Sequence, residues 1–222
     1  MTGGADEAAG PLRDVLAPAV VTRARTLFTG RVWDVVEETF DLGEAGTLTR
    51  EVVDHPGAVA VLALDEADRV LLIRQYRHPV GMHEWELPAG ILDVVGEPPQ
   101  EAAARELHEE TDHTARTWHV LADHFSSPGG LNEALRIFLA RDLAPVPDGE
   151  RHEREGEERG MPVRWVPLDE ARDAVLAGGL HNPTLVIGIH TAYALRERGW
   201  AGLRPADAPW PEHPRLRAAP GG

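Results

Sequence analysis

The sequence predicts a mixed α/β fold in which helices cover a sheet that is mixed or antiparallel. Strand-type segments follow one another in runs with few helical segments between them, whereas a doubly wound parallel sheet needs regular alternation of strand and helix. The G-x-G-x-x-G turn of dinucleotide-binding folds is also missing from the sequence. A chain of 222 residues with 42 % hydrophobic residues is long enough for one domain with a sizeable buried core.

The predicted strands are rich in β-branched and apolar residues and are bounded by turn residues. They cover residues 31–41, 47–53, 58–64, 70–77, 117–125, 134–141 and 163–166. The first two form a unit before Gly57. Because an isolated hairpin is marginally stable, we expect this unit to lean on another surface, such as a second subunit.

Helices are predicted at 100–111, 169–176 and 184–198. Pro98 and Pro99 can occupy the first turn of the first helix, and Asn182 can cap the third. Both termini are rich in Ala, Gly and Pro, so we expect them to be loose. The predicted organisation is a flexible segment (1–25), a small N-terminal β unit (26–55), a main domain (56–200) and a Pro-rich tail (201–222).

The amino-acid composition excludes several kinds of catalytic and metal chemistry. All 22 basic residues are Arg, and Cys is absent, which rules out Schiff-base lysines, thiol nucleophiles, disulfides and thiolate zinc sites. A net charge of -15 opposes nucleic-acid binding, and an anionic substrate would need a cation to bridge it to the protein. The sequence shows no membrane-length apolar run and no secretory signal, so we expect a cytoplasmic protein without membrane contact.

The most informative segment is the acidic helix. Glu106, Glu109 and Glu110 have the spacing i, i+3 and i+4, which places three carboxylates on one helical face. Hard oxygen ligands of this kind favour Mg²⁺, Mn²⁺ or Ca²⁺ over zinc. A solvated helix face would show the same spacing. The Pro-Ala-Gly turn at 88–90 favours a metal site, because such a turn lets backbone carbonyls approach an ion.

Residues 90–112, GILDVVGEPPQEAAARELHEETD, closely resemble the signature of the Nudix hydrolases. The matching positions are Gly90, Glu97, Arg105, Glu106, Leu107, Glu109 and Glu110. The sequence departs from the signature in having one extra residue before Glu97, Asp112 in place of Gly and His113 in place of an apolar residue. Asp112 can still end the helix, because Asp tolerates the left-handed conformation.

The resemblance implies an α/β/α sandwich with a mixed sheet, and Mg²⁺-dependent hydrolysis of a nucleoside diphosphate linked to another group. By position, Glu106 and Glu110 are implied as the principal metal ligands. Glu109 and the carbonyl of Ala89 are implied as further ligands. Arg105 is implied as a supporting member of the catalytic set, together with Glu97.

Two further segments, LIRQYRHPVGMHEWELPAG and SSPGGLNEALRIFLA, resemble the ADP-ribose pyrophosphatase branch of the family. In that branch a Pro about sixteen residues beyond the signature marks preference for ADP-ribose, and Pro128 matches it. Pro128 and Gly129 are therefore expected to bind substrate, although an ordinary tight turn would look the same. ADP-glucose or GDP-mannose are alternative substrates, and a non-catalytic ADP-ribose sensor is a less favoured alternative.

Other roles are assigned by position in the same branch. Glu157 is expected to be the general base, and Glu155 or Glu158 can exchange places with it in the alignment. Arg74 and Arg77 point to opposite faces of one strand, so one of them is expected to contact substrate. Trp33 is a candidate for stacking on adenine, as are Phe28 and Tyr76, although each is also an ordinary core residue. Related proteins exchange N-terminal strands with a partner, which implies a homodimer.

Overall fold

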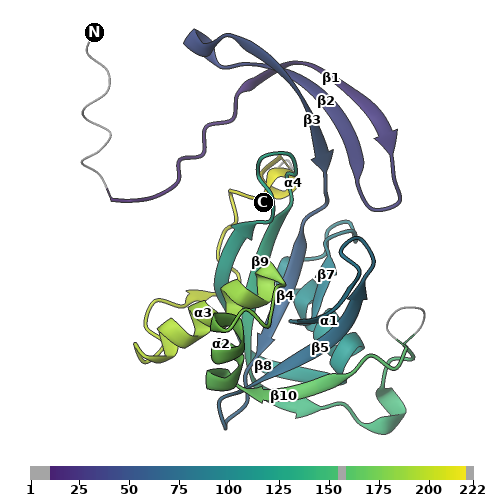
Figure 1. The fold of residues 1–222 in the computed structure, drawn as a ribbon, viewed down its shortest axis with the longest axis vertical. Helices are drawn as coiled ribbons and strands as arrows, with labels where there is room; N and C mark the ends of the chain where they lie inside the picture. Colours follow the sequence, from purple (N-terminus) through teal and green to yellow (C-terminus); the bar gives the residue numbers. More distant parts are fainter. Residues whose placement is uncertain (1–10, 155–158, 219–222) are drawn as a thin grey trace.

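The computed structural model describes residues 11–154 and 159–218. Figure 1 shows a body of strands with helices on its sides and a separate curved sheet. The short connection from β3 to β4 joins the curved sheet to the body. The helices are α1 (Pro99–Thr111), α2 (Leu168–Leu176), α3 (Pro183–Arg196) and the short α4 (Pro214–Ala218). The strands are β1 (Val20–Thr29), β2 (Asp34–Asp41), β3 (Thr47–Asp54), β4 (Ala58–Ala63), β5 (Arg69–Arg77), β6 (Met82–Glu86), β7 (Ala89–Ile91), β8 (His113–Phe125), β9 (Ala134–Pro145), β10 (Val163–Pro167) and β11 (Arg204–Pro205).

The body contains a five-stranded sheet in the order β11-β8-β9-β4-β7 and a three-stranded sheet in the order β10-β5-β6. Strands β4 and β9 run parallel, whereas β4 with β7 and β8 with β9 run antiparallel. The larger sheet is therefore mixed, as predicted.

Strand β4 is buried on both faces, which is why it reads as a continuous apolar run. Alternate residues enter two separate cores. One core contains Leu62 together with Leu185 and Ile189 of α3. The other contains Val61 together with Leu107 of α1. Helices thus cover both faces of the sheet, which confirms the predicted sandwich.

Helix α1 begins and ends as the sequence predicts. Pro99 occupies its first turn, where a missing N–H costs nothing. Asp112 adopts the left-handed conformation (φ 56°) and donates its backbone N–H to the carbonyl of His108. The substitution of Asp for the usual Gly is therefore accommodated, because Asp tolerates positive φ better than most residues.

The N-terminal unit is larger than expected. Strand β1 pairs with β2 to give a three-stranded sheet, and it begins at Val20, inside the segment that we expected to be loose. Every residue of β1 is exposed, including Phe28. The sequence pattern missed this strand because no face of it is buried within one chain.

The Pro-rich tail is also more ordered than expected. Trp210 and His213 are buried in it, and β11 pairs with β8. Strands β6 and β7 were not predicted as separate elements, because runs of five and three residues are too short to show a period. Among the described residues, no helix is long and apolar enough to cross a membrane.

Candidate active site

A cleft of about 400 Å³ opens beside β7, with walls from β5, β6, the loop before β9 and the start of α3. Its polar and backbone lining includes Arg77, Glu86, Ala89, Gly90, His55 and Glu133. These residues come from segments far apart in the sequence, and the folding of the sheets brings them together.

The acidic helix lies directly behind the floor of this cleft. Glu110 is buried, and its Oε2 accepts the backbone N–H of Ala89 at 2.9 Å. The side chain of Glu106 packs against Gly90 so closely that a Cβ on Gly90 would lie 2.0 Å from Glu106 Oε1. A Cβ at position 90 would displace the Glu106 side chain, so glycine at this position lets the Glu106 carboxylate lie against the cleft floor.

Arg105 neutralises the carboxylates around it. Its Nε and Nη2 donate to the two oxygens of Glu97, each at 3.0 Å, and its Nη1 donates to Glu106 Oε1 at 2.6 Å. The Nη1 group also lies 3.4 Å from Glu109 Oε2. The hydrogen bond from Arg105 lowers the pKa of Glu97 below its ordinary value. These contacts of Arg105 hold the carboxylates of Glu97, Glu106 and Glu109 in fixed orientations.

A second ion pair forms the side of the cleft. Glu86 is almost completely buried and accepts two hydrogen bonds from Arg77, from Nε at 2.7 Å and from Nη2 at 2.6 Å. This bond to Glu86 raises the pKa of Arg77 above its ordinary value. Arg74 lies instead over the ring of Trp85, 5.5 Å from its centroid. Of the two candidate arginines, the one that lines the cleft is Arg77.

Comparison with known proteins agrees with this geometry. The NUDIX domain model matches residues 54–183, more than half of the chain. The chain belongs to the Nudix family. The family predicted from the acidic helix is therefore confirmed.

Two relatives carry the same name. An ADP-ribose pyrophosphatase of Mycobacterium tuberculosis is 41 % identical over 196 residues, which cover 88 % of this chain and 93 % of that protein. An ADP-ribose pyrophosphatase of Bacillus subtilis is 34 % identical over 170 residues, which cover 77 % of this chain and 86 % of that protein. A solved structure described as an ADP compounds hydrolase superposes with a TM-score of 0.68 over 85 % of this chain and 100 % of that one. At 22 % identity, that structure supports the fold alone.

Nudix hydrolases are generally dependent on a divalent metal, and the oxygen donors at the cleft floor suit a hard cation of this kind. The Glu110 carboxylate binds the backbone N–H of Ala89, which lines the cleft, and Gly90 leaves room for the carboxylate of Glu106. In the described part of the chain, no group of three or more His, Asp or Glu side chains is already arranged around one metal position. In this structure Glu106 and Glu109 are instead paired with Arg105.

The expected general base lies outside the described residues. Glu157 and its alternatives Glu155 and Glu158 fall in the segment 155–158. Arg154 precedes this segment, and its Nε donates to the carbonyl of Glu109 at 2.8 Å while its Nη2 donates to Asp112. The chain therefore enters the acidic segment beside the C-terminal end of the Nudix helix.

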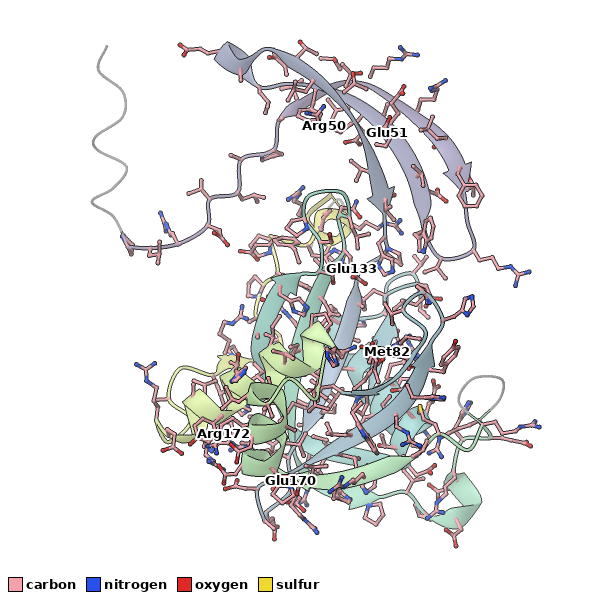
Figure 2. All side chains as sticks on the ribbon, viewed as in Figure 1. Arg50, Glu51, Met82, Glu133, Glu170 and Arg172 are labelled. Atoms are coloured by element: carbon pink, nitrogen blue, oxygen red, sulfur yellow. The ribbon has the colours of Figure 1, made fainter. Side chains whose placement is uncertain are left out.

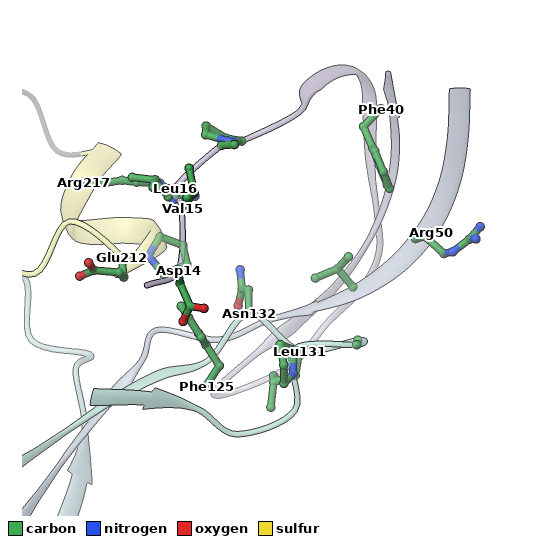
Figure 3. A pocket seen from close by; sticks show the side chains of 17 residues that line it. Asp14, Val15, Leu16, Phe40, Arg50, Phe125, Leu131, Asn132, Glu212 and Arg217 are labelled. Atoms are coloured by element: carbon green, nitrogen blue, oxygen red, sulfur yellow. The ribbon is translucent and has the colours of Figure 1, made fainter. Parts of the chain in front are cut away.

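The remaining candidates lie elsewhere. Pro128 and Gly129 line a different cavity of about 510 Å³, between the 14–18 segment, β3 and α4 (Figure 3). Trp33 lies in the β1–β2 connection, with its ring 6.2 Å from that of Phe28. Tyr76 is half-exposed, and its ring centroid lies 5.1 Å from that of His83 with the two rings tilted. The structure does not bring these residues into the cleft.

Three ionisable residues that line the cleft escaped the sequence analysis, namely Glu86, His55 and Glu133. Glu133, labelled in Figure 2 near the junction of the body and the N-terminal sheet, has its Oε1 3.4 Å from His55 Nδ1. Burial lowers the pKa of His55, while Glu133 opposes this shift. Nδ1 also accepts the backbone N–H of Gly57 at 3.1 Å. Nothing in the local sequence marks His55 or Glu133, because each is a single polar residue beside a strand.

Proposed function

We propose that this protein hydrolyses the diphosphate bond of ADP-ribose to AMP and ribose 5-phosphate, with Mg²⁺ as the preferred ion and Mn²⁺ as a substitute. The observation that carries the proposal is the packing of Glu106 and Glu110 against Ala89 and Gly90 at the floor of the cleft. The names of the two relatives support ADP-ribose as the substrate.

We propose the following residue roles, which the resemblance to the Nudix signature supports. Glu106, Glu109, Glu110 and the Ala89 carbonyl would hold the divalent ion. When bound, this ion supplies charge neutralisation for the diphosphate oxygens and lowers the pKa of the attacking water. Water attacks one phosphorus, the bond to the bridging oxygen breaks, and a loop carboxylate accepts the proton of the water. We propose that Arg77, which lines the cleft, contacts a phosphate.

The first test compares matched glutamate variants. We expect wild-type protein with Mg²⁺ to release AMP from ADP-ribose, as measured by liquid chromatography, and EDTA to abolish the release. Glu110→Gln should lower kcat by about 10²-fold or more, because it removes a ligand charge worth several kcal/mol in the transition state. Glu101→Gln removes an exposed charge from the same helix and should leave kcat unchanged. No AMP release from wild-type protein would refute the proposal.

The substrate class is tested by comparing kcat/KM for ADP-ribose, ADP-glucose and GDP-mannose, because specificity is the ratio of these values. A higher value for ADP-glucose or GDP-mannose would reassign the substrate within the same chemistry. Tight ADP-ribose binding without turnover at any metal concentration would instead identify a sensor.

We propose Glu157 as the general base, because Arg154 anchors the start of its segment beside Glu109. Glu157→Gln should lower kcat far more than Glu155→Gln or Glu158→Gln. A larger effect of either neighbour would move the role to that residue.

We also propose that the protein is a cytoplasmic homodimer. The fully exposed strand β1 and the exposed side chains of Phe28 and Trp33 support a surface that a second copy covers. We also propose that Trp33 stacks on adenine and that Pro128 with Gly129 forms the substrate loop. Because these residues do not line the cleft of their own chain, both roles would require the second copy of the dimer to bring them to it. Sedimentation that shows only a 24.2 kDa species at micromolar concentration would contradict the dimer.

A further inference from the structure

The C-terminal segment 204–218 is anchored to the body by a buried arginine. Arg136 is only 2 % exposed, and its Nη1 donates to the carbonyl of Ala208 at 2.7 Å. Its guanidinium lies over the ring of Trp210 at 4.5 Å, and Asp123 neutralises it through Nε at 2.7 Å. A buried arginine that has all these partners at once holds the segment in one position.

The same segment fits into the junction between β3 and β4. His213 is 1 % exposed, and a Cβ on Gly57 would lie 2.1 Å from His213 Nε2. Gly57 also has a φ of +90°, which side-chain-bearing residues rarely adopt. The backbone just before β4 is thus built around the ring of His213.

A chain of polar contacts continues from this segment to the cleft. Arg215 Nη2 donates to Asp54 Oδ2 at 3.1 Å, and Asn132 Nδ2 donates to Asp54 Oδ1 at 2.7 Å. The backbone N–H of His55 donates to Asn132 Oδ1 at 2.8 Å. His55 in turn lies against Glu133, and both line the cleft. Figure 3 shows Asn132 and Arg217 among the side chains that line the adjoining cavity.

We propose that the C-terminal segment positions the His55–Glu133 wall of the cleft, with Arg215 as a positioning residue of the substrate site. This inference rests on the proposed function for its kinetic consequence. Arg215 acts through Asp54, which accepts hydrogen bonds from both Arg215 and Asn132 and so ties the segment to the cleft wall. Loss of Arg215 removes one partner of the Asp54 carboxylate, which leaves Asp54 freer to move away from Asn132. Because Asn132 binds the backbone N–H of His55, the position of His55 then becomes less fixed.

The kinetic test uses Arg215→Ala with Arg217→Ala as its matched control. Both remove one positive charge from α4, but Arg217→Ala leaves the Arg215–Asp54 pair in place. We expect Arg215→Ala to raise KM for ADP-ribose about two- to fivefold, the range set by a partly exposed ion pair, with kcat nearly unchanged. Arg215→Lys should restore part of the wild-type KM. Equal KM values for the two alanine variants would overturn the inference.

A double-mutant cycle and hydrogen exchange complete the test. Asp54→Asn keeps an acceptor for Asn132 but loses the pair with Arg215, so its effect and that of Arg215→Ala should not add. Additive effects would contradict the contact chain. Amide exchange of Asp54, His55, Gly57 and residues 131–134 should become about two- to fivefold faster in Arg215→Ala and not in Arg217→Ala. Unchanged exchange would refute the inference even if wild-type protein failed to hydrolyse ADP-ribose, so the two proposals fail separately.

Discussion

Replacement of Gly90 by Ala should remove activity while leaving the fold intact. The new Cβ would lie 2.0 Å from Glu106 Oε1 and 2.1 Å from its Cδ, whereas ordinary contact begins at about 3.5 Å. The carboxylate must therefore move by about 1.5 Å. Since a misplacement of about 1 Å can cost about 10²-fold in rate, kcat should fall by about 10²-fold or more.

Stability should change little in this variant. Gly90 does not have a positive φ, so Ala can adopt its backbone conformation, and the atoms that must move are at the end of a flexible side chain. We expect a change in Tm below about 4 °C, which corresponds to about 1 kcal/mol for a chain of this size.

The assay measures kcat for ADP-ribose hydrolysis at saturating Mg²⁺, together with thermal unfolding. Gly149→Ala is the matched control, because no atom lies within 4 Å of the added Cβ and the φ of Gly149 is not positive. The reasoning is wrong if Gly90→Ala keeps more than half of the wild-type kcat. Inactivity caused by global unfolding would refute it equally, since the clash is confined to one side chain.

The other predictions concern ion pairs and one buried histidine. Arg77→Ala leaves the Glu86 carboxylate buried without its partner, so Tm should fall by about 6–12 °C for a loss of about 3 kcal/mol, and Arg77→Met with Glu86→Leu should recover most of it. An unchanged Tm in the single variant would contradict this. Burial lowers the pKa of His213 to about 4 from 6.5. Between pH 6.5 and 4 the proton binds this histidine in the unfolded chain but not in the folded one. The free energy of unfolding should therefore be unaffected by His213 above pH 6.5 and fall by about 3 kcal/mol as the pH drops from 6.5 to 4. The free energy of unfolding, measured in urea, should depend less steeply on pH in His213→Gln than in the wild type. Equal slopes in the two proteins would contradict the lowered pKa of His213. Arg105→Lys keeps the charge but cannot bind Glu97 through two N–H groups while it reaches Glu106, so kcat should fall about 10- to 100-fold in steady-state assays. A wild-type kcat in that variant would show that Arg105 does not orient Glu97 and Glu106 for catalysis.

The sequence was sufficient to predict those elements whose start, end and pattern are set by neighbouring residues. The acidic helix is predicted from residue 100 and begins at Pro99, because proline placement, helix formers and the end at Asp112 all act within a few residues. The apolar run of β4 likewise predicts a strand. The spacing of Glu106, Glu109 and Glu110 is itself a property of the helix, which is why the residue pattern alone is enough to indicate the family.

Long-range contacts explain what the sequence analysis missed. The tail looked loose because its order comes from Arg136, which binds the carbonyl of Ala208 from 72 positions away. Strand β1 has no buried face within the chain, so it lacks the alternation that marks strands. Pairs such as His55 and Glu133 meet only after the sheet has formed.

The amino-acid sequence alone therefore determined the fold class, the family and the placement of three carboxylates on one helix face, since each depends on residue type and short-range spacing. Tertiary structure decided that Arg77 rather than Arg74 lines the cleft, that Gly90 lets Glu106 lie against its floor, and that the C-terminal segment is anchored beside one of its walls. Those outcomes depend on the direction of each side chain and on contacts between distant segments, and both arise only when the sheet and helices pack together.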